Sequence, residues 1–100
     1  MIQHIVLFRF KDSATPGEIV AAGEALLAMK AGIPEIKGIH FGPNLGPSVK
    51  EYSHGLIVTC EDMGAVQRYL EHPIHRNTVD QVIAPIRDER LAADLETTLQ

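Results

Sequence analysis

The segment from Tyr69 to His75 places a phenol and two imidazoles around a proline. A neutral imidazole, whose ordinary pKa is about 6.5, can take a proton near neutral pH, and a phenol can donate a hydrogen bond to a carbonyl or enolate oxygen. Tyr69 and His75 are therefore candidate catalytic residues for proton transfer beside a carbonyl group. His72 precedes Pro73 at a predicted helix break, and we interpret it as a structural or surface residue.

Two further histidines, His4 and His54, lie in the two segments with the strongest strand character. If these segments are neighbouring central strands, the two imidazoles can meet as substrate-binding groups opposite Tyr69 and His75. The alternative interpretation is that His4 and His54 are buried in structural hydrogen bonds and that Tyr69 is a core residue. A zinc site is a weaker hypothesis because the histidine spacing matches no metal motif, and no serine lies in a nucleophile elbow.

The composition argues against several classes of partner. The formal net charge is −4 and Lys and Arg form no run, so we expect no nucleic-acid partner. No basic segment precedes an apolar one at the N-terminus, and no apolar stretch approaches the length of a membrane span. We therefore expect a soluble, cytoplasmic protein, and the single Cys60 fits a reducing compartment as a buried strand thiol.

Short β-branched runs and capped helices predict the order β-α-β-β-α-β, which is the split βαβ or ferredoxin-like arrangement. Thr15-Pro16-Gly17-Glu18 has the pattern of a capping box with proline at the first helical position, and Asp62 is the expected N-cap of a second helix. Pro73 ends that second helix and opens a further helical segment. The predicted strands cover residues 4–10, 36–41, 52–61 and 90–96, and the further helical segment covers 74–84.

Residues 1–100 are expected to form one α+β domain, with the helices on one face of a four-stranded antiparallel sheet. The strands at 4–10 and 52–61 carry apolar side chains on both faces, so the face opposite the helices also has to be covered. A second copy of the sheet is the simplest cover, and we therefore predict a homodimer through this face.

Four segments of the chain form a recognisable set, in this order: His4–Asp12, Ile33–Lys37, His54–Leu56 and His72–His75. Together they resemble the stress-responsive dimeric α/β barrel (Dabb) family. The resemblance spans almost the whole chain and implies a ferredoxin-like protomer whose sheet faces a second sheet, forming a dimeric α+β barrel.

One plant branch of that family, the olivetolic acid (polyketide) cyclases, offers a functional precedent. The resemblance places its catalytic tyrosine and histidine on Tyr69 and His75, and two of its pocket histidines on His4 and His54. The aromatic residues of its first helix are replaced by small or aliphatic ones between residues 22 and 26, which argues against a long-tailed polyketide as the substrate.

Plant members of the family also can hold a magnesium ion through backbone carbonyls at the end of the first helix. By position these carbonyls belong to Lys30, Ile33 and Ile36 here. The alternative interpretation is that Gly32-Ile33-Pro34 is only a helix stop. Apart from this ion we expect no cofactor.

Two classes of function follow from these observations. The first is a cofactor-independent enzyme of proton transfer, a cyclase or isomerase of an enolisable carbonyl compound, with an apolar pocket edged by His and Tyr. The second is a non-catalytic, stress-related dimer or a protein that binds a small apolar molecule. The volume of the cavity beside Tyr69 and His75 would distinguish them, because a filled cavity excludes a substrate.

Overall fold

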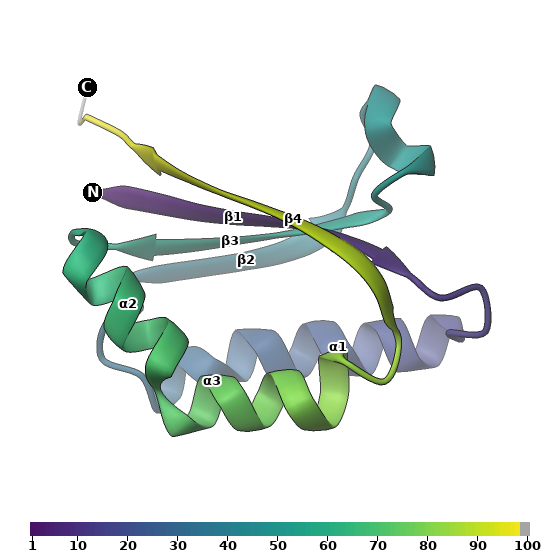
Figure 1. Cartoon of the computed structure of the whole chain (residues 1–100), viewed down its shortest axis with the longest axis horizontal. Helices are drawn as coiled ribbons and strands as arrows, with labels where there is room; N and C mark the ends of the chain where they lie inside the picture. The colour runs from purple at the N-terminus through teal and green to yellow at the C-terminus, as the bar shows by residue number, and fades with distance from the viewer. Residues whose placement is uncertain (99–100) are drawn as a thin grey trace.

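In the computed structural model, which describes residues 1–98, an antiparallel sheet of four strands carries a layer of helices on one face (Figure 1). The strand order is β2-β3-β1-β4, so the first and third strands are the central ones, as predicted. This arrangement confirms the ferredoxin-like α+β class. The strands are β1 (Ile2–Phe10), β2 (Gly38–Pro43), β3 (His54–Cys60) and β4 (Arg87–Glu96).

Both major helices begin at the predicted caps. Helix α1 (Pro16–Ala28) starts with the capping box, in which the Thr15 hydroxyl accepts from the Glu18 N–H at 3.1 Å. In return the Thr15 N–H donates to the Glu18 carboxylate at 2.9 Å. Helix α2 (Met63–Glu71) begins after Asp62, whose carboxylate accepts from the Ala65 N–H at 2.8 Å.

Pro73 separates α2 from the next helix, α3 (Pro73–Thr78), which continues as a π-helical turn at Val79–Ile83. His72 is held in an extended conformation before the proline, with φ −63° and ψ 136°. Its Nδ1 atom accepts a hydrogen bond from the Ile74 N–H at 3.1 Å, so His72 caps α3 and is structural, as predicted. The break redirects the chain: α2 leads away from the sheet, and α3 then runs along the sheet within the helix layer (Figure 1).

The core lies between the helices and the sheet face formed by alternate residues of the central strands. In β1 the even-numbered side chains are buried against the helices and the odd-numbered ones from Gln3 to Arg9 are half-buried on the other face. The strands and helices contribute Val6, Phe8, Leu56, Val58, Ala22, Leu26, Met29, Val66, Tyr69 and Ile83 to this core.

The helix layer leaves the opposite face of the sheet, which we call the outer face, uncovered (Figure 1). Ile57 is 39% exposed, and Leu91 and Leu95 on the edge strand β4 are each 51% exposed. Ile5 and Leu7 of β1 lie between them, opposite Ala93 and Leu91 of β4. In residues 1–98 no helix is long and apolar enough to cross a membrane.

Candidate active site

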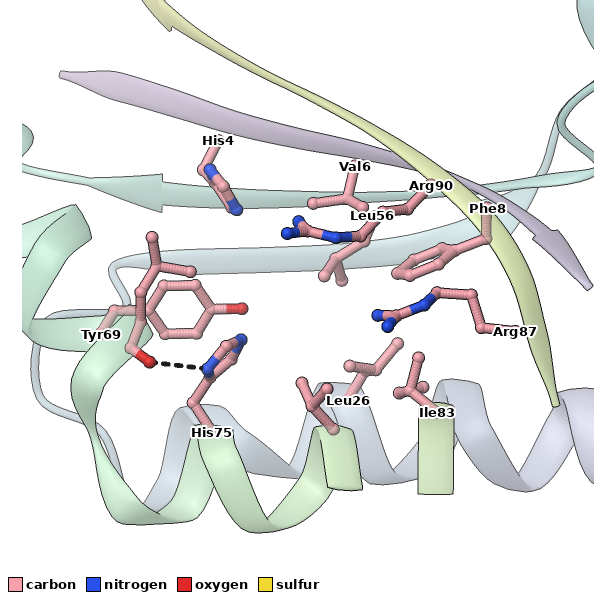
Figure 2. Close-up of a pocket in the computed structure, with 12 residues that line it drawn as sticks. His4, Val6, Phe8, Leu26, Leu56, Tyr69, His75, Ile83, Arg87 and Arg90 are labelled. Atoms are coloured by element: carbon pink, nitrogen blue, oxygen red, sulfur yellow. Dashed lines mark hydrogen bonds between the residues drawn. The ribbon is translucent and has the colours of Figure 1, made fainter. Parts of the chain in front are cut away.

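Tyr69, His75 and His4 meet around a cavity of about 190 Å³ between the sheet and the helices (Figure 2). The ring centroids of Tyr69 and His75 are 4.7 Å apart, and those of His4 and Tyr69 are 5.9 Å apart. The rest of the wall is mainly apolar. It includes Val6, Phe8, Leu26, Leu56, Leu70, Val79 and Ile83.

His75 is positioned by the first turn of α3, directly after the proline break. Its Nδ1 atom lies 2.9 Å from the Leu70 carbonyl oxygen, which can only accept, so Nδ1 carries the proton and donates it (Figure 2). The remaining nitrogen, Nε2, is therefore the free base of the neutral ring. Burial lowers the pKa of His75. The hydrogen bond to Leu70 opposes this shift, and the nearby His4, Arg90 and Arg76 lower the pKa further, so the imidazole is neutral at pH 7.

Tyr69 is buried on the inner side of α2, with 1% of its surface exposed. Its hydroxyl forms no hydrogen bond with any residue in the described part of the chain, yet no fully buried side-chain N or O in that part lacks a partner. The hydroxyl must therefore reach the cavity, and Figure 2 shows it pointing into the space beside His75. Burial raises the pKa of Tyr69 well above its ordinary range, so the phenol stays protonated and can donate.

His4 lies on β1, on the sheet side of the cavity, and is 4% exposed. Its cross-strand partner on β4 is Asp94, whose Oδ1 atom lies 2.7 Å from His4 Nδ1. A carboxylate accepts from the Nδ1–H, which leaves Nε2 of His4 available toward the cavity. Asp94 was not predicted from the sequence, and the only local signal for it is its place among alternating residues of the last strand.

The prediction that His4 and His54 meet is wrong. β1 and β3 are antiparallel neighbours, and their register pairs His4 with Val58 and His54 with Phe8. Four residues of strand separate the two positions by about 13 Å. The error came from treating adjacent strands as if both histidines lay at the same end, whereas antiparallel pairing sends the start of β3 to the end of β1.

His54 accordingly lies outside the cavity that contains Tyr69. Its ring stacks on Phe41 at 5.6 Å and contacts the edge of Phe10 at 5.4 Å between centroids. Its Nδ1 atom is 2.8 Å from the Ser53 hydroxyl, and it borders a separate hollow beside Gly23 on α1. Among the histidines predicted for the site, the structure brings together His4 and His75 only.

Two arginines that the sequence analysis missed complete the cavity wall. Arg87 and Arg90 reach it from β4, and Figure 2 shows both guanidinium groups directed inward. β4 begins at Arg87, three residues earlier than predicted, because a register shift at Arg9 and Phe10 pairs Phe10 with Arg87. No periodic pattern in the sequence predicts such a bulge.

The carbonyls proposed for magnesium lie at the end of α1, away from the residues of the cavity. Ile33 and Ile36 have buried side chains, and the Ile33 carbonyl accepts from the Ile36 N–H at 3.2 Å, which leaves one of its lone pairs free. The magnesium site at Lys30, Ile33 and Ile36 stays a prediction. Within residues 1–98 no cluster of three His, Cys, Asp or Glu side chains could hold a metal ion.

The family model for the stress responsive A/B barrel domain matches residues 2–97. An uncharacterized protein of Streptomyces coelicolor is 31% identical over 78 residues, which cover 76% of this chain and 80% of that protein. Olivetolic acid cyclase of Cannabis sativa is 28% identical over 76 residues, covering 74% of this chain and 75% of the cyclase.

Solved structures agree with these sequence matches. A dimeric ferredoxin-like protein of unknown function from Thermobifida fusca superposes with a TM-score of 0.82 at 32% identity. The similarity covers 96% of this chain and 90% of that protein. The two-layer fold and the strand order are therefore those of a known structural family.

Proposed function

The chain belongs to the stress responsive A/B barrel domain family, and on this premise we propose that it is a cofactor-independent enzyme that transfers a proton beside a carbonyl group. The observation that carries the proposal is the pairing of a neutral His75, with its Nε2 atom free, and a protonated Tyr69 hydroxyl across one cavity. The 28% identity to olivetolic acid cyclase of Cannabis sativa supports the proposal, because that relative is named as a cyclase.

The chemistry needs one base and one hydrogen-bond donor. His75 Nε2 takes a proton from the α-carbon, and the electrons of the broken C–H bond move into an enolate. Tyr69 donates its hydroxyl hydrogen to the enolate oxygen and stabilises the developing charge. The protonated His75 then returns its proton at another atom, which is isomerisation. In cyclisation, the enolate carbon instead attacks a second carbonyl carbon, the C=O π electrons move to that carbonyl oxygen, and this oxygen takes the proton from His75.

The cavity limits the size of the substrate. A cavity of about 150 Å³ can hold benzene, and the cavity beside Tyr69 has about 190 Å³. A group about the size of benzene therefore fits inside the cavity, and a long tail would have to extend outside it. The apolar wall formed by Val6, Leu26 and Leu56 would exclude water from the enolate.

Deuterium exchange at the α-carbon tests the proposal directly. We expect the protein to accelerate exchange of 4-oxopentanoate and 2-pentanone in D₂O, followed by proton NMR, above the rate in buffer. His75→Asn keeps a donor for the Leu70 carbonyl but removes the base, so exchange should fall to the buffer rate. Tyr69→Phe should lower it by about 100-fold, the typical effect of losing one oxyanion donor.

His72→Asn is the matched control, because it removes an imidazole from the same turn and keeps an acceptor for the Ile74 N–H. It should exchange at the wild-type rate. If the wild-type protein does not exceed the buffer rate with either compound, or if His75→Asn is as active as wild type, the enzyme proposal fails. A small-molecule-binding protein would then be the better description.

We also infer that the protein is a homodimer through the outer face. The exposed Ile57, Leu91 and Leu95 would lose contact with water there, and an apolar face of this kind in a small protein marks an interface. The Thermobifida fusca protein of the same fold, at 32% identity, is described as dimeric. The cavity lies on the other side of the sheet, so dimerisation leaves it open.

A further inference from the structure

We propose that the cavity selects a substrate bearing a carboxylate, and that Arg87 and Arg90 are the residues that bind it. The catalytic part of this inference rests on the proposed proton transfer, whereas the anion site itself stands on the geometry of β4. The substrate class is a small oxo acid, with the carboxylate at the Arg87 end of the cavity, within reach of Arg90, and an enolisable carbonyl beside Tyr69 and His75.

The register of β4 places both arginines on the inner face of the sheet. Arg90 is paired with Phe8, and directly paired residues of antiparallel strands share a face, so Arg90 points the same way as the buried Phe8. The bulge at Arg9 and Phe10 gives Arg87 the partner Phe10, which is also buried. Without the shift, Asp88 would face the cavity in its place.

Neither inward arginine has a carboxylate partner within residues 1–98, although β4 is rich in acidic residues. Asp88 and Glu89 lie beside them in the sequence, but both bind Arg9, at 2.8 and 2.9 Å. The acidic side chains are thus used on the outer side of the sheet. The inward guanidinium groups keep all their donors free for a ligand.

The charges around the cavity are therefore of one sign. Its wall contains two arginines and two histidines and no carboxylate. Asp94 lies behind His4 and is already engaged by the His4 Nδ1 atom at 2.7 Å. An anion would neutralise the positive charge that two arginines place on one cavity wall, and a guanidinium binds a carboxylate through two parallel hydrogen bonds. The whole chain is acidic, with a net charge of −4, so this local excess of positive charge does not reflect composition.

The position of the arginines also orients a ligand. Arg87 comes from the start of β4, far along the strand from Asp94, and Figure 2 shows its guanidinium across the cavity from Tyr69. The apolar residues Leu26 and Leu56 lie along the wall between the two polar ends. A short anion held by Arg87 thus presents its carbonyl end to Tyr69 and His75, which is the placement that proton transfer requires, whereas the Arg90 guanidinium lies nearer to His4 (Figure 2).

Calorimetric titration with benzoate and benzamide tests the anion site without any catalytic step. The two probes have the same shape and differ in charge, and each is close to the cavity in size. We expect benzoate to bind at least 10-fold more tightly than benzamide. The double variant Arg87→Gln/Arg90→Gln should lose this preference, whereas Arg90→Lys, which keeps the charge, should retain part of it.

Arg76→Gln is the matched control. Arg76 lies on α3, is exposed, and does not line the cavity, so its loss changes the net charge equally and should leave the benzoate preference unchanged. Equal binding of benzoate and benzamide by the wild-type protein would overturn the proposal. A preference that survives in a folded Arg87→Gln/Arg90→Gln variant would overturn it as well.

Exchange rates separate this inference from the proposed function. If 4-oxopentanoate and 4-oxopentanamide exchange equally fast and benzoate shows no preference, proton transfer stands and the anion site fails. If benzoate binds as expected to wild type and to His75→Asn but no compound exchanges, the anion site stands and the enzyme proposal fails. If both hold, 4-oxopentanoate should exchange at least 10-fold faster than its amide at low concentration, and Arg87→Gln/Arg90→Gln should remove the difference.

Discussion

The histidines of this chain differ in what their Nδ1 atom contacts, and that contact decides what each imidazole can do. The Leu70 carbonyl accepts from Nδ1 of His75, and Asp94 accepts from Nδ1 of His4, so both rings keep Nε2 free on the cavity side. In His72 the Nδ1 lone pair is used by the Ile74 N–H. A histidine becomes a candidate base here because of a backbone or carboxylate acceptor behind it.

The pH dependence of exchange follows from the pKa of His75. Burial and the charge of Arg90 lower this pKa below its ordinary 6.5, so the rate should rise with pH through a midpoint below 6.5 and then stay level. The pKa of Tyr69 is raised above its ordinary 10, so no loss of rate is expected up to pH 9. NMR exchange rates from pH 4.5 to 9 measure the profile.

Arg90→Gln provides an internal check on the pH profile, because removing a positive charge raises the pKa of His75 and moves the midpoint to higher pH. The free energy of unfolding should also increase with pH in this range, because the same His75 proton is involved. The unfolded chain takes up the His75 proton near pH 6.5 and the folded chain only at lower pH, so stability is lost as pH falls below 6.5. A midpoint above 6.5 in the wild-type protein would contradict the assignment of His75 as the base.

At the scale of elements, the helix ends could be predicted from the sequence and the relative placement of strands could not. The Thr15 capping box, the Asp62 cap and the Pro73 break depend on residues within four positions of one another, so local chemistry determines them. His54 was misplaced because its position depends on the register between β1 and β3, which only the packed sheet defines. Arg87 was missed for a similar reason, since the bulge that turns it inward depends on pairing with Phe10.

The residues of the site fall into the same two groups, those placed by local sequence and those placed by strand pairing. Tyr69 and His75 lie six residues apart across one helix break, and the sequence predicted that they belong together. His4 joins them from a central strand as expected, but its partner Asp94 lies 90 positions away in the chain, and Arg90 is placed by pairing with Phe8, 82 positions away. Whether Asp94 and Arg90 reach the cavity depends on which face of the edge strand packs against the helices, and β4 has charged residues on both faces.

Gly23 in α1 tests how tightly the helix layer meets the sheet. A Cβ atom at this position would lie 2.7 Å from Cδ2 of Phe41, whose ring also stacks on His54. Gly23→Ala should therefore destabilise the protein, because the overpacking cost of about 1–3 kcal/mol exceeds the gain of about 1 kcal/mol from helix propensity. Urea unfolding measures the difference.

Gly17→Ala is the control for that substitution, since a Cβ there has only Thr15 Oγ1 nearby, at 4.0 Å. The same change of residue in the same helix should be neutral or stabilising. If Gly23→Ala stabilises the protein as much as Gly17→Ala does, the Phe41 ring is not held against α1. The Phe41 ring could then move, and the His54 hollow and the Tyr69 cavity would be less clearly separated than their lining residues indicate.

At the scale of the whole molecule, the two faces of the sheet have different tasks. The inner face and the helices build the cavity, and the outer face presents Ile5, Leu7 and Ile57 with no helix over them. A chain of 100 residues buries only a limited fraction of its surface on folding, so an uncovered apolar sheet face lowers the stability of an isolated protomer. Dimerisation and folding are therefore expected to be coupled.

Leu7→Asp tests this coupling. Leu7 lies on the central strand β1 and packs beside Gly55 of β3, so a carboxylate there enters the middle of the outer face in both copies. Burying two carboxylates of the same sign costs more free energy than the apolar contacts of the interface gain. We expect light scattering to report a dimer of twice the 11.0 kDa chain mass for the wild-type protein, and a monomer with a lower melting temperature for Leu7→Asp.

Val20→Asp separates an effect of the interface from a general effect of adding charge. Val20 is 60% exposed on α1, on the helix side of the molecule, and its substitution should leave the dimer intact. A wild-type protein that is monomeric at micromolar concentration would contradict the outer-face interface, and so would a Leu7→Asp variant that stays dimeric. Because the cavity lies on the other face, any Leu7→Asp protein that remains folded should still bind benzoate, which places assembly and ligand recognition on opposite sides of one sheet.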